Sequence, residues 1–162
     1  MSYAIPKTES VAGYVRRLTA QDIAACVYLG SIMHAESSYA CIAYNQIKVA
    51  HLLRTCVDDE NHFAAVAGKE RIDGFIAGYV TPYFFSDELI AQDFGVFVRP
   101  DARGARIGAS LVKKFRDWAF AKGCLEVCLG ITTGVATERT TQFYESLGFE
   151  RAGNIMKLKR AT

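Results

Sequence analysis

Two arginines and two glycines stand together at the start of a predicted helix, in the segment of residues 98–109, VRPDARGARIGA. Pro100 ends the apolar run before it, because the proline ring disfavours helical geometry at Arg99. The first amides of a helix have no intrahelical partner, and the helix dipole places about half a positive charge there. A glycine-containing helix start beside Arg103 and Arg106 therefore favours binding of a phosphate or pyrophosphate.

The spacing alone leaves a second interpretation open, in which this segment is a plain turn with a solvated basic face. It has neither the G-x-x-x-x-G-K-[ST] pattern of a P-loop nor the G-x-G-x-x-G pattern of a dinucleotide-binding fold. In an anion site, Gly104 would take a positive φ angle or allow a close approach to the backbone. The residues by themselves leave the anion site and the plain turn as alternatives.

The elements around this turn predict one mixed α/β unit. Strands are expected at residues 14–18, 63–67, 72–80, 90–98, 125–131, 149–152 and 155–158, and helices at 22–35, 46–56, 104–122 and 137–147. The order is β-α-α-β-β-β-α-β-α-β-β, which predicts a mixed sheet flanked by helices. Gly95 interrupts one strand and indicates a bulge or a close backbone approach. The strand–helix–strand unit of residues 90–131 is expected to be a right-handed crossover.

Composition limits the classes of protein that remain. The length of 162 residues fits a single domain, in which residues 1–12 form an N-terminal extension. A net charge of +2 argues against a nucleic-acid-binding surface. The five cysteines lack paired C-x-x-C spacing, which predicts reduced thiols, no metal site and a cytoplasmic location. We expect no membrane span and no secretion signal, because the sequence has no long apolar run.

Residues 98–109 resemble the acetyl-CoA-binding motif of the GCN5-related N-acetyltransferase (GNAT) family, written Q/R-x-x-G-x-G/A after a strand with an apolar-x-Val-x-Pro ending. Residues 137–149, TERTTQFYESLGF, resemble the family's downstream motif, in which a tyrosine on a short helix precedes Gly-Phe. Two motifs in the family's order are far more specific than one. The order of elements extends the resemblance over nearly the whole chain and implies a single-domain, mostly antiparallel sheet. Arg106 stands where the first motif glycine is expected.

The resemblance implies which residues hold acetyl-CoA. The amides at the helix start would hold its pyrophosphate, and its pantetheine arm would pair with the strand before the turn. The amide of Val96 is the one expected to polarise the thioester carbonyl. The implied cofactor-binding residues are Val96, Phe97, Val98, Arg103, Gly104, Ala105, Arg106, Ile107, Gly108 and Ala109.

The resemblance also implies transfer of the acetyl group by direct attack of an amine. Tyr144 matches the family's tyrosine that protonates the departing thiolate, and a phenol with a pKa of ~10 donates a proton at neutral pH. The alternative is a tyrosine that only packs in the core. Two carboxylates compete as the base: Glu36, in the loop after the first helix, and Asp93, on the strand beside the thioester. Each has a plain alternative as a solvated side chain.

These expectations describe a cytoplasmic N-acetyltransferase that uses acetyl-CoA as co-substrate and needs no metal. Its acceptor is an amine of a small molecule or a protein, which the sequence does not identify. One alternative, motivated by Arg106, is an acyl-CoA-binding regulatory module without turnover. Another is nucleic-acid binding by the basic helix, which the near-neutral charge disfavours. Family members are often dimers, so a homodimer stays open, and no membrane partner is expected.

Overall fold

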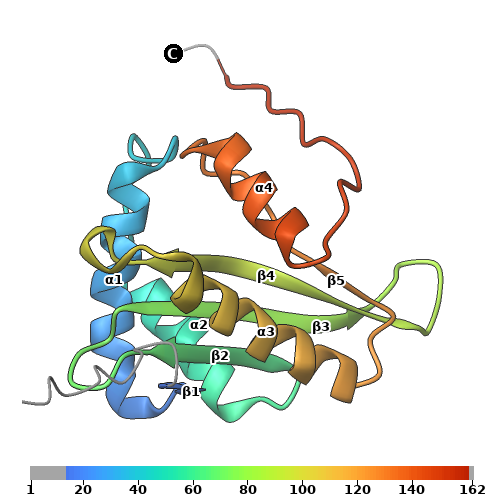
Figure 1. Cartoon of the computed structure of the whole chain (residues 1–162), viewed down its shortest axis with the longest axis horizontal. Helices are drawn as coiled ribbons and strands as arrows, with labels where there is room; N and C mark the ends of the chain where they lie inside the picture. The colour runs from blue at the N-terminus through green and yellow to red at the C-terminus, as the bar shows by residue number, and fades with distance from the viewer. Residues whose placement is uncertain (1–13, 161–162) are drawn as a thin grey trace, which may run out of the picture.

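Residues 14–160 are described by the structure, a computed structural model (Figure 1). The N-terminal extension expected over residues 1–12 lies outside them. One sheet in the order β1-β2-β3-β4-β5 is built from Val15–Arg17, His62–Ala67, Gly74–Pro82, Leu89–Val98 and Glu126–Cys128. Strands β1 to β4 pair antiparallel, and β4 pairs parallel with β5. The prediction of a mixed, mostly antiparallel sheet in an α/β domain is therefore confirmed.

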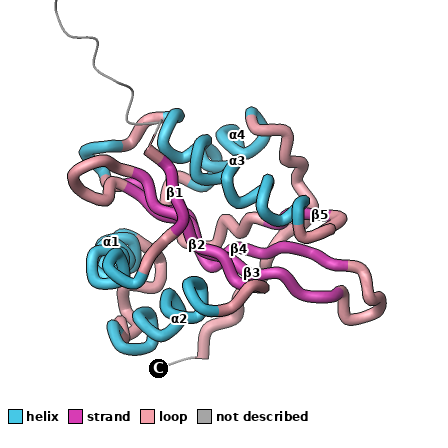
Figure 2. Tube along the Cα trace, turned by 90° about the horizontal axis from the view of Figure 1, so that it is seen from below, coloured by secondary structure: helices cyan, strands magenta, loops and turns pink. Residues whose placement is uncertain are grey.

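Helices cover both faces of this sheet (Figure 2). Helices α1 (Ile23–Glu36) and α2 (Gln46–Asp58) lie on one face, and α3 (Ala105–Ala121) and α4 (Thr137–Ser146) lie on the other. One-turn 3₁₀ helices, Ala20–Asp22 and Pro100–Ala102, precede α1 and α3. Side chains alternate between the faces of β2, so that Phe63 and Ala65 pack with α3 whereas Ala64 and Val66 pack with α1 and α2.

The packing of α3 against the sheet determines where that helix begins. Phe115 and Leu111 of α3 are fully buried, and burial of one such side chain contributes about 1.5–3 kcal/mol. Gly78 of β3 allows this close packing, because a Cβ there would stand 2.6 Å from the Phe115 ring and 2.5 Å from the Gln92 carbonyl oxygen. The helix is thereby held against β3 and β4, with its first turn at the end of β4.

Strand β4 carries the irregularity that Gly95 predicted. Gly78 pairs with Asp93 whereas Ala77 pairs with Gly95, so Phe94 is an extra residue on β4. The pairing of β4 with β5 ends one residue earlier, at Gln92. Beyond this point the strands separate, and within the described residues the β5-facing edge of β4 is left without a partner strand. The bulge and the separation together open a space along β4.

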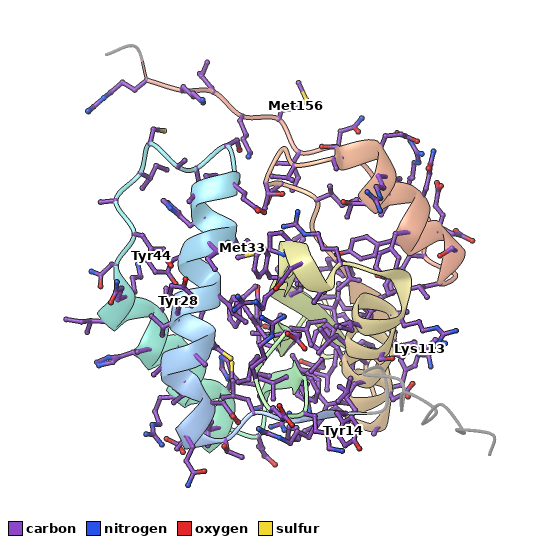
Figure 3. The ribbon with its side chains drawn as sticks, turned by 60° about the vertical axis from the view of Figure 1, so that its left-hand side comes forward. Tyr14, Tyr28, Met33, Tyr44, Lys113 and Met156 are labelled. Carbon is purple, nitrogen blue, oxygen red and sulfur yellow. The ribbon has the colours of Figure 1, made fainter. Side chains whose placement is uncertain are left out.

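The two strands expected at residues 149–152 and 155–158 are not present in the structure. Residues 149–160 form no strand and pass beyond α4 towards the loop that follows α1 (Figure 1). The alternating apolar pattern has no sheet face to bury against, since Met156 is 89% and Leu158 100% exposed. Figure 3 shows Met156 pointing away from the domain. This expectation was wrong because an alternating pattern forms a strand only where neighbouring side chains cover it.

One lysine joins the end of this segment to two loops, in addition to the ion pairs that join Arg151 to α4. The Lys157 ammonium donates hydrogen bonds to the Tyr39 hydroxyl and to the Thr132 carbonyl oxygen, both at 2.7 Å. It also lies 4.2 Å from the centre of the Tyr39 ring, a cation–π distance. The final segment is therefore joined to the loop after α1 and to the loop after β5.

Candidate active site

A cleft of about 1090 Å³ opens where β4 and β5 separate. The second half of β4 forms one wall, and the loop after β5 forms the other. Helix α4 and residues 152–155 close one side, and the end of α1 lies at the mouth. Met33 of α1 points towards the sheet (Figure 3), and its methyl carbon lies 3.4 Å from where a Cβ of Gly95 would stand.

The structure places most of the predicted cofactor-binding residues along this cleft. Those that line it are Val96, Phe97, Val98, Arg103, Gly104 and Gly108. Arg106, Ile107 and Ala109 do not line it, and Ala105 is the first residue of α3. Ile107 instead packs in the core, and Arg106 is exposed. The Arg106 side chain therefore leaves the cleft unobstructed although it replaces a motif glycine.

The two glycines of the turn have different roles. Gly104 is the N-cap of α3 with φ −166° and ψ 151°, an extended conformation open to any residue. Of the two expected alternatives, the positive φ angle is therefore excluded, and an open approach to the backbone remains. A Cβ on Gly104 would meet no atom within 4 Å, and no side chain caps the amides of α3. A Cβ on Gly108 would stand 3.2 Å from the Phe143 ring, which lets α4 pack on α3. Gly104 thus leaves open space over a bare helix start.

Arg103 is tied across the mouth of the cleft. Its Nε donates to the Val98 carbonyl oxygen at 3.1 Å, and its guanidinium carbon lies 5.6 Å from the centre of the Phe97 ring. Its Nη2 donates to Glu36 Oε2 at 2.5 Å. Glu36 is the last residue of α1, not part of the following loop as predicted. Two residues predicted for separate roles, in cofactor binding and in proton transfer, therefore form an ion pair.

Asp93 lies where the two walls of the cleft separate. Its Oδ1 accepts a hydrogen bond of 2.7 Å from the amide of Gly130, in the loop after β5. Burial raises the pKa of the Asp93 carboxyl to about 6, against the opposing effect of the Gly130 amide. A carboxylate with a pKa close to neutrality is suited to accept a proton from a substrate.

Tyr144 reaches the same cleft from α4. Its ring packs in the core between Phe143 and Phe149, with ring centroids 5.5 and 5.8 Å away. Burial raises the pKa of the phenol, and the charge of Asp93 raises it further. Within residues 14–160 the Tyr144 hydroxyl has no hydrogen-bonding partner. The phenol therefore keeps its proton at neutral pH and has that proton available for a bound group.

The start of α4 carries backbone strain beside the cleft. Ala136, which precedes α4, has φ 43° and ψ 46° and is the one non-glycine residue with a positive φ in the described part of the chain. A left-handed alanine costs about 1 kcal/mol or more and persists where the surrounding structure enforces it. Ala136 itself lines the cleft. The strain therefore accompanies the sharp turn that positions α4 and Tyr144.

Sequence reasoning missed Arg139, a cation that lines the cleft from α4. It has no ion-pair partner within the described residues. The signal was its place in the same short helix as Tyr144. The basic helix considered for nucleic-acid binding is α3, whose residues Lys113 (Figure 3) and Lys114 are exposed and do not line the cleft.

Within residues 14–160, no helix is long and apolar enough to cross a membrane. No group of three or more histidine, cysteine, aspartate or glutamate side chains is placed there to hold a metal ion.

Comparison with known proteins identifies the family and the fold. The sequence model described as "Acetyltransferase (GNAT) family" matches residues 29–149. No curated protein is similar enough in sequence to count as a relative. Similar solved structures include an acetyltransferase of Trypanosoma brucei, at 22% identity and TM-score 0.69, over 90% of this chain and 98% of that one. A transcriptional regulator of Bacillus halodurans C-125 has 26% identity and TM-score 0.71 over the same shares.

A third similar structure is a ribosomal-protein-alanine N-acetyltransferase of Brucella melitensis biovar Abortus 2308. It has 18% identity and TM-score 0.68, over 91% of this chain and 98% of that one. The segment matched by the family model runs from within α1 to Phe149 and so contains Arg103, Asp93 and Tyr144. The chain belongs to the GNAT family of acetyltransferases.

Proposed function

We propose that this protein transfers the acetyl group of acetyl-CoA to a neutral amine of an acceptor in the cleft between β4 and β5. One observation carries the proposal: a single cleft brings together an uncapped helix start, an unpaired strand edge and the side chains of Asp93 and Tyr144. Each feature matches one part of acetyl transfer. Acetyl-CoA supplies the activated thioester, and the protein binds, orients and exchanges protons.

The start of α3 suits the pyrophosphate of the co-substrate. The open space over Gly104 lets phosphate oxygens reach uncapped amides at the positive end of the helix dipole. Arg103 adds a forked donor at the same mouth, and Arg139 adds a second positive charge within the cleft.

The unpaired edge of β4 suits the pantetheine arm. Beyond Gln92 the backbone of β4 has amide and carbonyl groups available for an added strand, which is how an extended ligand pairs with a sheet edge. We assign to the Val96 amide the role of donor to the thioester carbonyl oxygen. Such a preorganised donor stabilises the negative charge that develops on that oxygen.

Two proton transfers complete the reaction. The C–N bond forms as the C–S bond breaks, the amine nitrogen loses a proton to Asp93, and the thiolate takes one from Tyr144. Asp93 is ionised in about nine molecules of ten at a pH one unit above its pKa, and the buried Tyr144 stays protonated. Glu36 is the weaker candidate for the base, because it lies at the mouth of the cleft at the end of α1, whereas Asp93 lies where the two walls of the cleft separate.

The acceptor remains a class rather than a compound. Similar structures include a ribosomal-protein-alanine N-acetyltransferase and an aminoglycoside acetyltransferase from a soil metagenome, so one fold serves acceptors of very different size. The segments around the mouth, residues 36–45 and 152–157, would make the acceptor's contacts in this chain.

The test is an assay of thiol release from acetyl-CoA with a panel of amines: polyamines, aminoglycosides, amino acids and peptides with free N-termini. We expect release that depends on one class of amine, with the acetylated amine identified by mass spectrometry. Binding of acetyl-CoA without turnover on any class would instead favour the acyl-CoA-binding module.

A further inference from the structure

The Arg103–Glu36 ion pair joins the two sides of the cleft mouth. Glu36 ends α1, which lies on one face of the sheet, and Arg103 precedes α3, which lies on the other. The side chains are 32% and 43% exposed, so the pair is open to solvent and to ligands. Both residues line the cleft.

The position of Glu36 is unfavourable for the helix that carries it. A carboxylate at the C-terminal end of a helix meets the negative end of the helix dipole, where a cation is preferred. Arg103 supplies the compensating charge, and Glu36 has no other hydrogen-bonding partner within residues 14–160. This ion pair therefore joins α1 to the turn before α3 at the mouth of the cleft.

Arg103, which carries this guanidinium, directly precedes Gly104, the N-cap of α3, whose first amides are bare. Arg103 commits Nε to Val98 and Nη2 to Glu36, so a phosphate that used the outer nitrogens of the fork would meet the Glu36 carboxylate first. Two anions that share one partially exposed guanidinium repel each other. The anion that accepts hydrogen bonds from more protein donors displaces the other. A pyrophosphate has the helix amides as additional donors, and Glu36 does not.

We infer that Glu36 is an internal competitor of the co-substrate, so that acetyl-CoA binds by taking Arg103 from Glu36. The inference rests on the proposed function, because it needs the pyrophosphate at the start of α3. Glu36 then determines how tightly coenzyme A is held, and ligands that do not use Arg103 are insensitive to it.

The test is calorimetric titration of coenzyme A, and of pantetheine, which lacks phosphate, into the wild type and three variants: Glu36→Gln, Arg103→Ala and the double variant. We expect Glu36→Gln to bind coenzyme A about two- to fivefold more tightly, the effect of an exposed ion pair. Pantetheine binding should be unchanged. Glu70→Gln, an exposed residue between β2 and β3, makes the same change of net charge and should change neither affinity.

The double variant separates exchange from simple repulsion. Glutamate beside an anionic ligand repels it even without Arg103, so repulsion alone predicts the same Glu36→Gln effect in both backgrounds. If coenzyme A instead takes Arg103 from Glu36, Glu36→Gln should change the affinity for coenzyme A much less when Arg103 is already replaced by alanine. If that variant binds too weakly for calorimetry, stabilisation against heat at high coenzyme A concentration gives the same comparison.

Three results would overturn the inference. They are an equal Glu36→Gln effect in both backgrounds, no effect in the wild-type background, and tighter binding of pantetheine. If neither the wild type nor any of the three variants binds coenzyme A, the proposed function itself fails. The two failures are therefore distinguishable.

Discussion

Tyr144→Phe is expected to lose most acetyl transfer while keeping acetyl-CoA bound. The substitution removes one hydroxyl and retains the ring between Phe143 and Phe149, so the core should stay packed. Loss of a general acid lowers kcat about 10²- to 10⁴-fold. The KM for acetyl-CoA should change little, because the phenol acts on the leaving thiolate and not on the bound pyrophosphate.

The measurement is steady-state kinetics of thiol release with an amine identified from the panel, together with an unfolding temperature. Tyr28→Phe is the matched control, since Tyr28 on α1 (Figure 3) is 60% exposed and does not line the cleft. Full activity of Tyr144→Phe would mean that this tyrosine only packs in the core.

Asp93→Asn should make the protein more stable and less active. The folded protein keeps a proton on Asp93 up to about pH 6, whereas the reference pKa of the group is 3.8. The folded state therefore holds more protons between these values, and stability falls as pH rises through that window. At neutral pH the partly buried charge of Asp93 costs up to about 3 kcal/mol, which asparagine removes while still accepting the Gly130 hydrogen bond.

Two measurements check this prediction. Denaturant unfolding at neutral pH should show Asp93→Asn to be the more stable protein, and the difference should disappear below pH 3.8. The wild-type rate should rise with pH through an apparent pKa of about 6, and the variant should lose both that dependence and most of its activity. Asp58→Asn, at the exposed end of α2, should change neither quantity. A variant that is active and less stable would contradict the role given to Asp93.

Local sequence signals predicted the elements that hold the site. Pro100 and Gly104 marked the end of β4 and the start of α3, and Gly95 marked the bulge. These predictions succeeded because a proline ring, a helix start and a strand interruption depend mainly on adjacent residues. The two family motifs singled out the turn before α3 and Tyr144, and residues of both line one cleft in the structure.

Interactions between distant residues were not predictable in this way. The pairing of Arg103 with Glu36, 67 residues apart, depends on how α1 packs on the sheet. The raised pKa of Asp93 depends on burial beside Gly130, which neighbouring residues do not reveal. The alternation of Met156 and Leu158 with lysines resembled a strand, although no partner strand lies beside it in residues 14–160.

The most direct test of the account is calorimetric titration of acetyl-CoA into the wild type and Gly104→Asp. Aspartate is a favoured N-cap residue and fits the extended backbone there, so the unfolding temperature should stay the same or rise. Its carboxylate would cover the amides of α3 and repel a pyrophosphate. We predict one acetyl-CoA per wild-type chain and binding weaker by about tenfold or more in the variant. Equal binding by both proteins, or none by the wild type, would contradict the central claim that this helix start holds the co-substrate.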